Sequence, residues 1–291
     1  MEREQDNGII CKYCHSAAVV KFGKYKNVQR YWCKSCQRKL KADDALFHMK
    51  KPLGWVSRAL GLFYNGMSIA NIGSYLQREY GYHPSKSVVY EWIDKYTSVA
   101  IEHFKNYKPK VGDSWILDET IINTNGRKIC FCDIIDIKTH FLLASGALLH
   151  HTGEDAQKLM ESAFKRAGKT PRVIVTNNPS SYPEGTELNF SAATEDSQRS
   201  RFVFKENKAL VELFRGAFKE RIKVIRGFKD FDTLNEFAEG FAVFYNFFKP
   251  HEALGGRTPA DVAQIAYKAR NWADVGRISM SSRAKVRFAK Q

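Results

Sequence analysis

The stretch Trp115-Ile116-Leu117-Asp118-Glu119-Thr120 decides the fold, because a short apolar strand here leads directly into acidic residues. Three consecutive apolar residues are typical of a strand that is buried on both faces. Asp118 is expected at the end of this strand. An aspartate in that place is either a turn residue or part of a functional site, and the sequence around it has to distinguish the two.

Two strands, a helix and a further strand are predicted after this stretch. Lys128 to Ile137 and His140 to Leu148 are rich in Ile, Phe and Leu, which favours strands. Apolar residues recur at helical spacing from Gly153 to Ala167. Arg172 to Thr176 is typical of a buried strand, and Asn177-Asn178-Pro179 stops it.

The rest of this region predicts two more helices. Residues 180–206 are rich in Ser, Glu and Pro and give no assignable element. One helix is expected from Asn207 to about Ile225, and another from about Phe231 to Phe248, ending before Pro250. Three strands, a helix, a strand and two helices form an α/β pattern.

The composition indicates a polyanionic partner. Among 291 residues, 46 Lys and Arg outnumber 31 Asp and Glu, giving a net charge of +15 and a pI near 9.5. No apolar run approaches the roughly 20 residues that a membrane span needs. The N-terminal residues Met1 to Asp6 lack the apolar core of a signal peptide. We therefore expect a soluble, cytoplasmic protein and favour nucleic acid over a membrane surface as the partner.

Two Cys-x-x-Cys pairs predict a zinc site. Cys11-Lys12-Tyr13-Cys14 and Cys33-Lys34-Ser35-Cys36 are separated by residues 15–32, a gap of 18 that can form a hairpin. Four thiolates, from Cys11, Cys14, Cys33 and Cys36, make a closed tetrahedral site of the structural kind. Coincidental buried cysteines and a redox pair are the alternatives. Cys130 and Cys132 alternate in an apolar run and are expected to be ordinary buried strand cysteines.

Basic residues between the two cysteine pairs are candidate DNA contacts. They alternate with aromatic residues, which can pack the small module. The alternative is a solvated basic face over an aromatic core. The candidates are Lys21, Lys24, Lys26 and Arg30.

Residues 53–104 are expected to be helical, and their second part predicts a helix-turn-helix. Ser68 is a plausible N-cap for one helix and Ser85 for the next, with a break at Tyr80-Gly81-Tyr82-His83-Pro84 between them. The first residues of the second helix would enter the major groove. These are Lys86, Ser87 and Tyr90. A purely structural three-helix bundle is the alternative.

Carboxylates in the second half of the chain fit a divalent metal site. Asp118 follows a strand, and Glu212 lies one turn into a predicted helix. A third ligand is expected directly after the strand that ends at Thr176. Two-metal phosphoryl transfer requires clustered carboxylates, and Mg²⁺ prefers oxygen ligands.

Several of these stretches together resemble the DDE transposases of bacterial and archaeal insertion sequences, which share the RNase H-like core of retroviral integrases. The stretch around Asp118 resembles the first-aspartate motif. Val173-Ile174-Val175-Thr176-Asn177 resembles the strand of the second aspartate, and Val211-Glu212 resembles the glutamate helix. Residues 178–211, 34 in number, separate Asn177 from Glu212, which is the usual gap in the family.

Two further stretches extend the resemblance over nearly the whole chain. Asp133-Ile134-Ile135-Asp136 resembles the strand pair after the first aspartate, and Asp136 is expected to be structural. The C-terminal signature of the group is matched by Tyr245-Asn246-Phe247-Phe248-Lys249-Pro250-His251, then Leu254-Gly255, then Thr258-Pro259-Ala260. A zinc-ribbon transcription regulator with an unrelated α/β domain would leave this signature unexplained.

The resemblance implies an α/β chain of several modules. The expected order is a zinc ribbon, a helix-turn-helix domain, a linker, an RNase H-like DDE core and a basic tail. Their expected bounds are residues 1–50, 51–104, 105–112, 113–267 and 268–291. The tail holds seven Lys or Arg residues and one acid, which is typical of nonspecific binding to a DNA backbone.

The resemblance also implies the chemistry. Asp118, the residue at 177 and Glu212 would be catalytic, with Mg²⁺ or Mn²⁺ held by Asp118 and Glu212. Basic residues on and after the glutamate helix would hold phosphates, unless they form a solvated face. These are Arg215, Lys219 and Arg221. The partners would be double-stranded DNA, as transposon ends and target, and further copies of the chain in a dimer or larger assembly. The setting would be a prokaryotic cytoplasm, at the nucleoid.

The sequence departs from the family at the expected metal site. Asn177 stands where the second aspartate belongs, and Leu213 stands where the group usually has Arg. An amide oxygen can ligate a metal but brings no negative charge, so catalysis is expected to be weak. Drift or domestication after loss of catalysis and an engineered Asp→Asn replacement both remain open.

Overall fold

The computed structural model describes residues 11, 16, 18–25, 28–41, 52–124, 127–148, 153–176, 187–188, 200–204 and 231–278. The chain divides into two compact units. One joins the residues up to Leu60 with those from Trp272 onward, and the other runs from Gly61 to Asn271. The helix predicted from Asn207 to about Ile225 lies outside the described residues.

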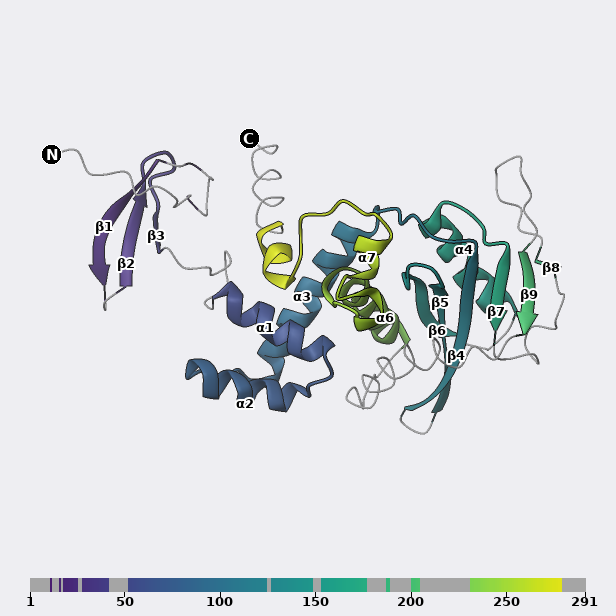
Figure 1. The fold of residues 1–291 in the computed structure, drawn as a ribbon. Coiled ribbons are helices and arrows are strands. Elements are labelled where there is room, and N and C mark those ends of the chain that lie inside the picture. The colour runs from purple at the N-terminus through teal and green to yellow at the C-terminus, as the bar shows by residue number, and fades with distance from the viewer. Residues whose placement is uncertain are drawn as a thin grey trace. The chain divides into compact units, whose positions relative to one another are not determined.

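The N-terminal module is a three-stranded antiparallel sheet (Figure 1). Its strands are β1 (Val19–Tyr25), β2 (Val28–Cys33) and β3 (Lys39–Lys41), in that order across the sheet. The hairpin predicted between the cysteine pairs is therefore confirmed by β1 and β2. The core of this module is small and contains two cysteines. It consists of Cys11, Val19, Tyr31, Cys33 and Leu40.

Three helices follow the sheet, as predicted: α1 (Leu53–Tyr64), α2 (Ile69–Tyr80) and α3 (Lys86–Phe104). Both predicted N-caps are confirmed. The Ser68 side chain accepts a hydrogen bond from the Asn71 amide, and the Ser85 side chain accepts one from the Val88 amide. Gly81 ends α2 with a left-handed φ of 66°, which a glycine adopts without strain.

The second half of the chain is built on a six-stranded sheet in the order β6-β5-β4-β7-β9-β8 (Figure 1). The strands that the sequence predicts are β4 (Ser114–Thr124), β5 (Arg127–Asp136), β6 (Leu142–Leu148) and β7 (Val173–Thr176). Two short strands, β8 (Glu187–Leu188) and β9 (Ser200–Phe204), fall in the stretch that gave no assignable element. Strand β4 pairs antiparallel with β5 and parallel with β7, so the sheet is mixed, and the predicted α/β class is confirmed.

The predicted end of the first strand is wrong. Strand β4 does not stop at Asp118 but continues to Thr124. The added residues include Thr120, Ile121 and Ile122, whose β-branched side chains favour an extended backbone. Pairing with β5 runs along the whole added part. Asp118 therefore lies inside a long strand and not at its end.

Helices complete the domain. Helix α4 (Gly153–Ala167) has the predicted bounds, and its Phe164 ring lies 5.7 Å from that of Trp115 on β4. The helix predicted from about Phe231 to Phe248 is in fact α6 (Phe231–Val243) followed by a π-helical turn η1 (Phe244–Phe248). Among the helices in the described ranges, none is long and apolar enough to cross a membrane.

The outer edge of β6 is sealed by amide side chains from α6 and η1. Asn246 accepts a hydrogen bond from the Leu142 amide at 2.9 Å and donates one to the Leu142 carbonyl at 2.8 Å. Asn235 accepts one from the Ala147 amide at 2.9 Å. These bonds satisfy polar groups that an unpaired edge strand would otherwise leave open.

The rest of the C-terminal signature has a structural role as well. The His251 ring is hydrogen-bonded to the Tyr245 carbonyl at 3.1 Å. Thr258 begins the short helix α7 (Pro259–Val262) with a capping box. Burial lowers the pKa of His251 to about 4, so its ring is neutral at pH 7. The signature therefore fixes the turn that follows η1.

Helices α3 and α6 pack closely because α6 has a glycine at the contact. The Tyr64 hydroxyl, at the end of α1, is hydrogen-bonded to the Thr97 hydroxyl of α3 at 2.7 Å. A Cβ atom on Gly240 of α6 would come within 3.0 Å of both side chains, closer than real Cβ atoms approach. Any larger residue at this position would have to displace these side chains or the helices that carry them.

We predict that Gly240→Ala lowers the free energy of unfolding by about 1–3 kcal/mol, through overpacking. Gly61→Ala is the matched control, since a Cβ there has nothing within 4 Å. In this control, the free energy of unfolding should rise by up to about 1 kcal/mol, because alanine has the higher helix propensity. Urea unfolding followed by circular dichroism measures both. An unchanged midpoint for Gly240→Ala would contradict the close contact.

Candidate metal centre and DNA-contacting residues

Asp118 is buried in the middle of the sheet. It is 1% exposed, and it lies on β4 between the antiparallel neighbour β5 and the parallel neighbour β7. Placing a carboxylate there is costly unless a cation or a proton compensates its charge. The position indicates that Asp118 has a function beyond ending a strand.

A second buried carboxyl lies directly opposite. Asp133 on β5 is the register partner of Asp118, is also 1% exposed, and accepts a hydrogen bond of 2.5 Å from the Ser145 hydroxyl on β6. Burial, opposed by this hydrogen bond and assisted by the nearby Asp118, raises the pKa of Asp133 well above its ordinary value. From the sequence, Asp133 was expected in a strand pair and not in the site.

Asp136 differs from Asp133, and the structural role expected for it is confirmed. It accepts hydrogen bonds from the Gly112 amide at 2.9 Å, the Thr139 amide at 2.8 Å and the Thr139 hydroxyl at 2.6 Å. Three donors satisfy this carboxylate, which fixes the turn between β5 and β6. It also lies on the opposite face of the sheet, because side chains alternate along a strand.

The other predicted catalytic positions lie outside the described residues. Strand β7 ends at Thr176, which pairs with Leu117, the residue before Asp118. Asn177 follows Thr176 in the sequence, and neither it nor Glu212 or Leu213 is described. The same holds for three predicted phosphate contacts, Arg215, Lys219 and Arg221.

The segment that carries Asp118 is similar to known proteins. The family model for the DDE domain of IS240-type transposases matches residues 112–251. Over this segment the chain is similar to a DDE domain of the transposase type, and we refer to it below as the DDE domain. Its mixed sheet, with β4 antiparallel to β5 and parallel to β7, has the RNase H-like arrangement that the sequence predicts. No curated protein matches the chain.

Solved structures of retroviral integrases are similar to the DDE domain at low identity. The catalytic core of HTLV-2 integrase in complex with magnesium, in its trimeric form, has 15% identity and a TM-score of 0.38, covering 54% of this chain and 99% of that chain. Its dimeric form has 15% identity and a TM-score of 0.39, covering 54% and 97%. A simian T-cell lymphotropic virus intasome in complex with PP2A regulatory subunit B56 gamma has 14% identity and a TM-score of 0.39, covering 56% and 60%.

A separate group of thiols lies in the N-terminal module. The sulfur atoms of Cys11, Cys33 and Cys36 all lie within 4.8 Å of one another, and those of Cys11 and Cys36 are 3.6 Å apart. Tetrahedral zinc with bonds of about 2.3 Å needs sulfur atoms roughly 3.8 Å apart, so the three thiols fit this ion. Cys14, the fourth predicted ligand, lies outside the described residues.

Backbone hydrogen bonds position two of the thiols. The Cys11 amide donates to the Ser16 carbonyl at 3.0 Å, and the Gln37 amide donates to the Cys33 carbonyl at 2.9 Å. Gln37 has a left-handed φ of 55°, which closes the turn that begins at Cys33. The two strand cysteines are as expected: Cys130 and Cys132 are buried, and burial raises the pKa of Cys130 to about 12.

The predicted recognition residues are exposed at the start of α3. Lys86, Ser87 and Tyr90 are all exposed, and the Tyr90 side chain is 59% accessible. Two neighbouring residues of the helix face inward: Val89 is fully buried and Trp92 is 4% exposed. The start of α3 therefore offers a polar, accessible surface on a packed helix.

The basic residues of the N-terminal module differ in accessibility. Lys21 is exposed, whereas Arg30 is half-buried and lies over the Phe22 ring at 5.7 Å. Lys39, which is not among the predicted contacts, is exposed and lies 4.6 Å from the centre of the same ring. For Lys24 only the backbone in β1 is described, and Lys26 lies outside the described residues.

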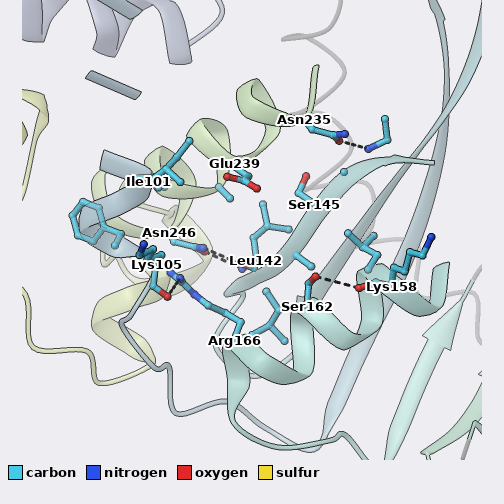
Figure 2. Close-up of a pocket in the computed structure, with 18 of the residues that line it drawn as sticks. Ile101, Lys105, Leu142, Ser145, Lys158, Ser162, Arg166, Asn235, Glu239 and Asn246 are labelled. Atoms are coloured by element: carbon cyan, nitrogen blue, oxygen red, sulfur yellow. Dashed lines mark hydrogen bonds between the residues drawn. The ribbon is translucent and has the colours of Figure 1, made fainter. Parts of the chain in front are cut away.

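A cavity of about 560 Å³ lies along the outer edge of β6 (Figure 2). Helices α3, α4 and α6 also line it, and none of the predicted site residues is among its lining. Arg166 in this cavity donates a hydrogen bond to the Lys105 carbonyl at 2.8 Å, and burial lowers its pKa to about 10. Ser145 on β6, which donates the hydrogen bond to Asp133, also lines the cavity.

We predict that the purified chain holds one Zn²⁺ and that Cys33→Ser removes it, because a closed site of this kind needs all four thiolates. Elemental analysis measures the zinc content. Cys130→Ser is the matched control and should keep one zinc per chain. Metal-free wild-type protein whose N-terminal sheet resists chelators would contradict the site.

Proposed function

We propose that this chain is a DNA transposase that binds transposon ends and carries out metal-dependent strand cleavage and transfer. The observation that supports this most is Asp118, a carboxylate buried at the centre of the sheet of a transposase-type DDE domain. The proposal extends to the catalytic set Asp118, Asn177 and Glu212, of which only Asp118 is described.

Asp118 and Glu212 would hold Mg²⁺ or Mn²⁺. The donor set fits these ions, because they prefer carboxylate oxygens. When bound, two such cations activate the attacking oxygen and stabilise the leaving oxygen in phosphoryl transfer. The contribution of the chain is to place the carboxylate of Asp118 on a rigid central strand in a site that excludes bulk water, where charge acts strongly.

Asn177 is expected to weaken catalysis. It has nearly the shape of an aspartate but removes one of the three negative charges that would surround the cations. Loss of a charge in a partly dry site costs several kcal/mol of transition-state stabilisation, or on the order of 10³ in rate. The second candidate function, a transposase-derived DNA-binding protein without catalysis, is favoured by this same residue and by Leu213.

DNA binding is assigned to three groups of residues. The first residues of α3 would read base edges in the major groove, with Lys86, Ser87 and Tyr90 as the contacts. The basic residues of the zinc module and those after Glu212 would neutralise phosphates. Since two DNA ends must be joined, we expect a two-fold dimer or a larger assembly on DNA, in the cytoplasm of a prokaryote. The domain bounds given above, including residues 105–112 as linker, belong to the same proposal.

We predict that Lys86→Ala abolishes preference for the element's own ends while leaving most nonspecific affinity, because one base contact is lost and most phosphate contacts stay. Lys138→Ala is the control, since Lys138 is equally exposed but lies in the turn after β5. Fluorescence anisotropy with end DNA and with unrelated DNA, at several salt concentrations, measures sequence preference and nonspecific affinity separately. Unchanged specificity after replacing Lys86, Ser87 and Tyr90 together would refute the groove assignment.

We predict that the unaltered chain cleaves the DNA ends of its own element little or not at all with Mg²⁺. Asn177→Asp should raise the cleavage rate on the order of 10³-fold, because it restores the third negative charge. Asn178→Asp is the matched control and should not raise the rate. Gel analysis of labelled end DNA measures cleavage. No gain with Asn177→Asp would favour the second candidate function, and efficient cleavage by the unaltered chain would contradict the assignment of position 177.

A further inference from the structure

The acids at the centre of the sheet form a row with Ser145. Asp118 on β4, Asp133 on β5 and Ser145 on β6 are successive register partners across three strands. Directly opposed residues of antiparallel strands point to the same face, with Cβ atoms about 4.5–5.5 Å apart. The two carboxyls therefore share one face of the sheet, and both are almost fully buried.

Asp133 lacks the donors that a structural aspartate has. Asp136, three residues later on the same strand, is satisfied by three hydrogen bonds. In the part of the chain that the structure describes, Asp133 accepts only one, from Ser145 to its Oδ1 atom. Within the same ranges no lysine or arginine forms an ion pair with Asp133. A buried carboxylate with one donor, facing another buried acid, needs either a cation or a proton to compensate its charge.

We propose that Asp133 is a further ligand of the divalent cation at Asp118, supplying the negative charge that Asn177 does not. This rests on the proposed function, since it assumes that Asp118 binds the cation. The cation is Mg²⁺ or Mn²⁺, because two carboxylates form a hard oxygen site. Ser145 holds one oxygen of the Asp133 carboxylate through its hydrogen bond and leaves the other as the proposed ligand.

The test is Mn²⁺ binding by the full chain, measured by electron paramagnetic resonance on protein loaded with zinc. Asp133→Asn should weaken Mn²⁺ binding at least tenfold, because the amide keeps the shape and the acceptor for Ser145 but loses the charge. Asp136→Asn is the matched control. It should lower the melting temperature and leave Mn²⁺ affinity within twofold. Asp133→Asn with affinity within twofold of the unaltered chain would overturn the proposal.

A thermal readout keeps the test valid if a variant is unstable. Without divalent cation, Asp133→Asn should melt no lower than the unaltered chain, since a buried charge is removed. Mn²⁺ should then raise its melting temperature less than it raises that of the unaltered chain. A merely structural Asp133 would show the reverse, with a lower melting temperature and an unchanged response to Mn²⁺.

Two further variants separate this inference from the proposed function. If Asp118→Asn loses Mn²⁺ binding and Asp133→Asn keeps it, the inference fails and the proposed function stands. If Asp133→Asn loses Mn²⁺ binding but Asn177→Asp still does not cleave DNA, the inference stands and the transposase activity fails. In the Asn177→Asp background, Asp133→Asn should reduce the Mn²⁺ affinity by a smaller factor than it does in the unaltered chain, because the third negative charge is restored. An equal loss in both backgrounds would overturn the compensating role of Asp133.

Discussion

The structure of the DDE domain depends on the burial of charge at the centre of its sheet. Asp118 and Asp133 face each other across β4 and β5, each 1% exposed. Two carboxylates cannot both stay ionised in so dry a place without a counter-charge. A divalent cation satisfies this constraint and also provides the chemistry expected of a DDE domain. The proposed metal site is therefore supported by electrostatics as well as by the similarity to DDE domains.

The remaining elements keep this central sheet rigid. Asn246 and Asn235 close the edge of β6, so that the strand carrying Ser145 cannot pair with another chain. Gly240 lets α6 approach α3, which links the exposed start of α3 to the DDE domain within one compact unit. The C-terminal signature thus has a physical explanation that does not involve catalysis.

Local patterns were enough to predict much of this. Ser68 and Ser85 identified two helix starts, because capping depends on a few neighbouring residues. The spacing of the cysteines predicted a thiol cluster, because two thiols separated by two residues can bind one metal ion. The opposition of Asp133 to Asp118 could not be predicted, because it depends on the register between β4 and β5. An aspartate inside the apolar run of β5 was the only signal in the sequence. The length of β4 and the strands β8 and β9 were missed because their stability comes from pairing with neighbours.

The metal site at Asp118 and Asp133 is tested most directly by a crystal structure of the full chain grown with MnCl₂, with anomalous data collected at the manganese and zinc edges. We expect a manganese peak in bonding contact with the carboxylates of both Asp118 and Asp133, and a zinc peak among the cysteines of the N-terminal module. A clear zinc peak with no manganese at either aspartate would contradict it.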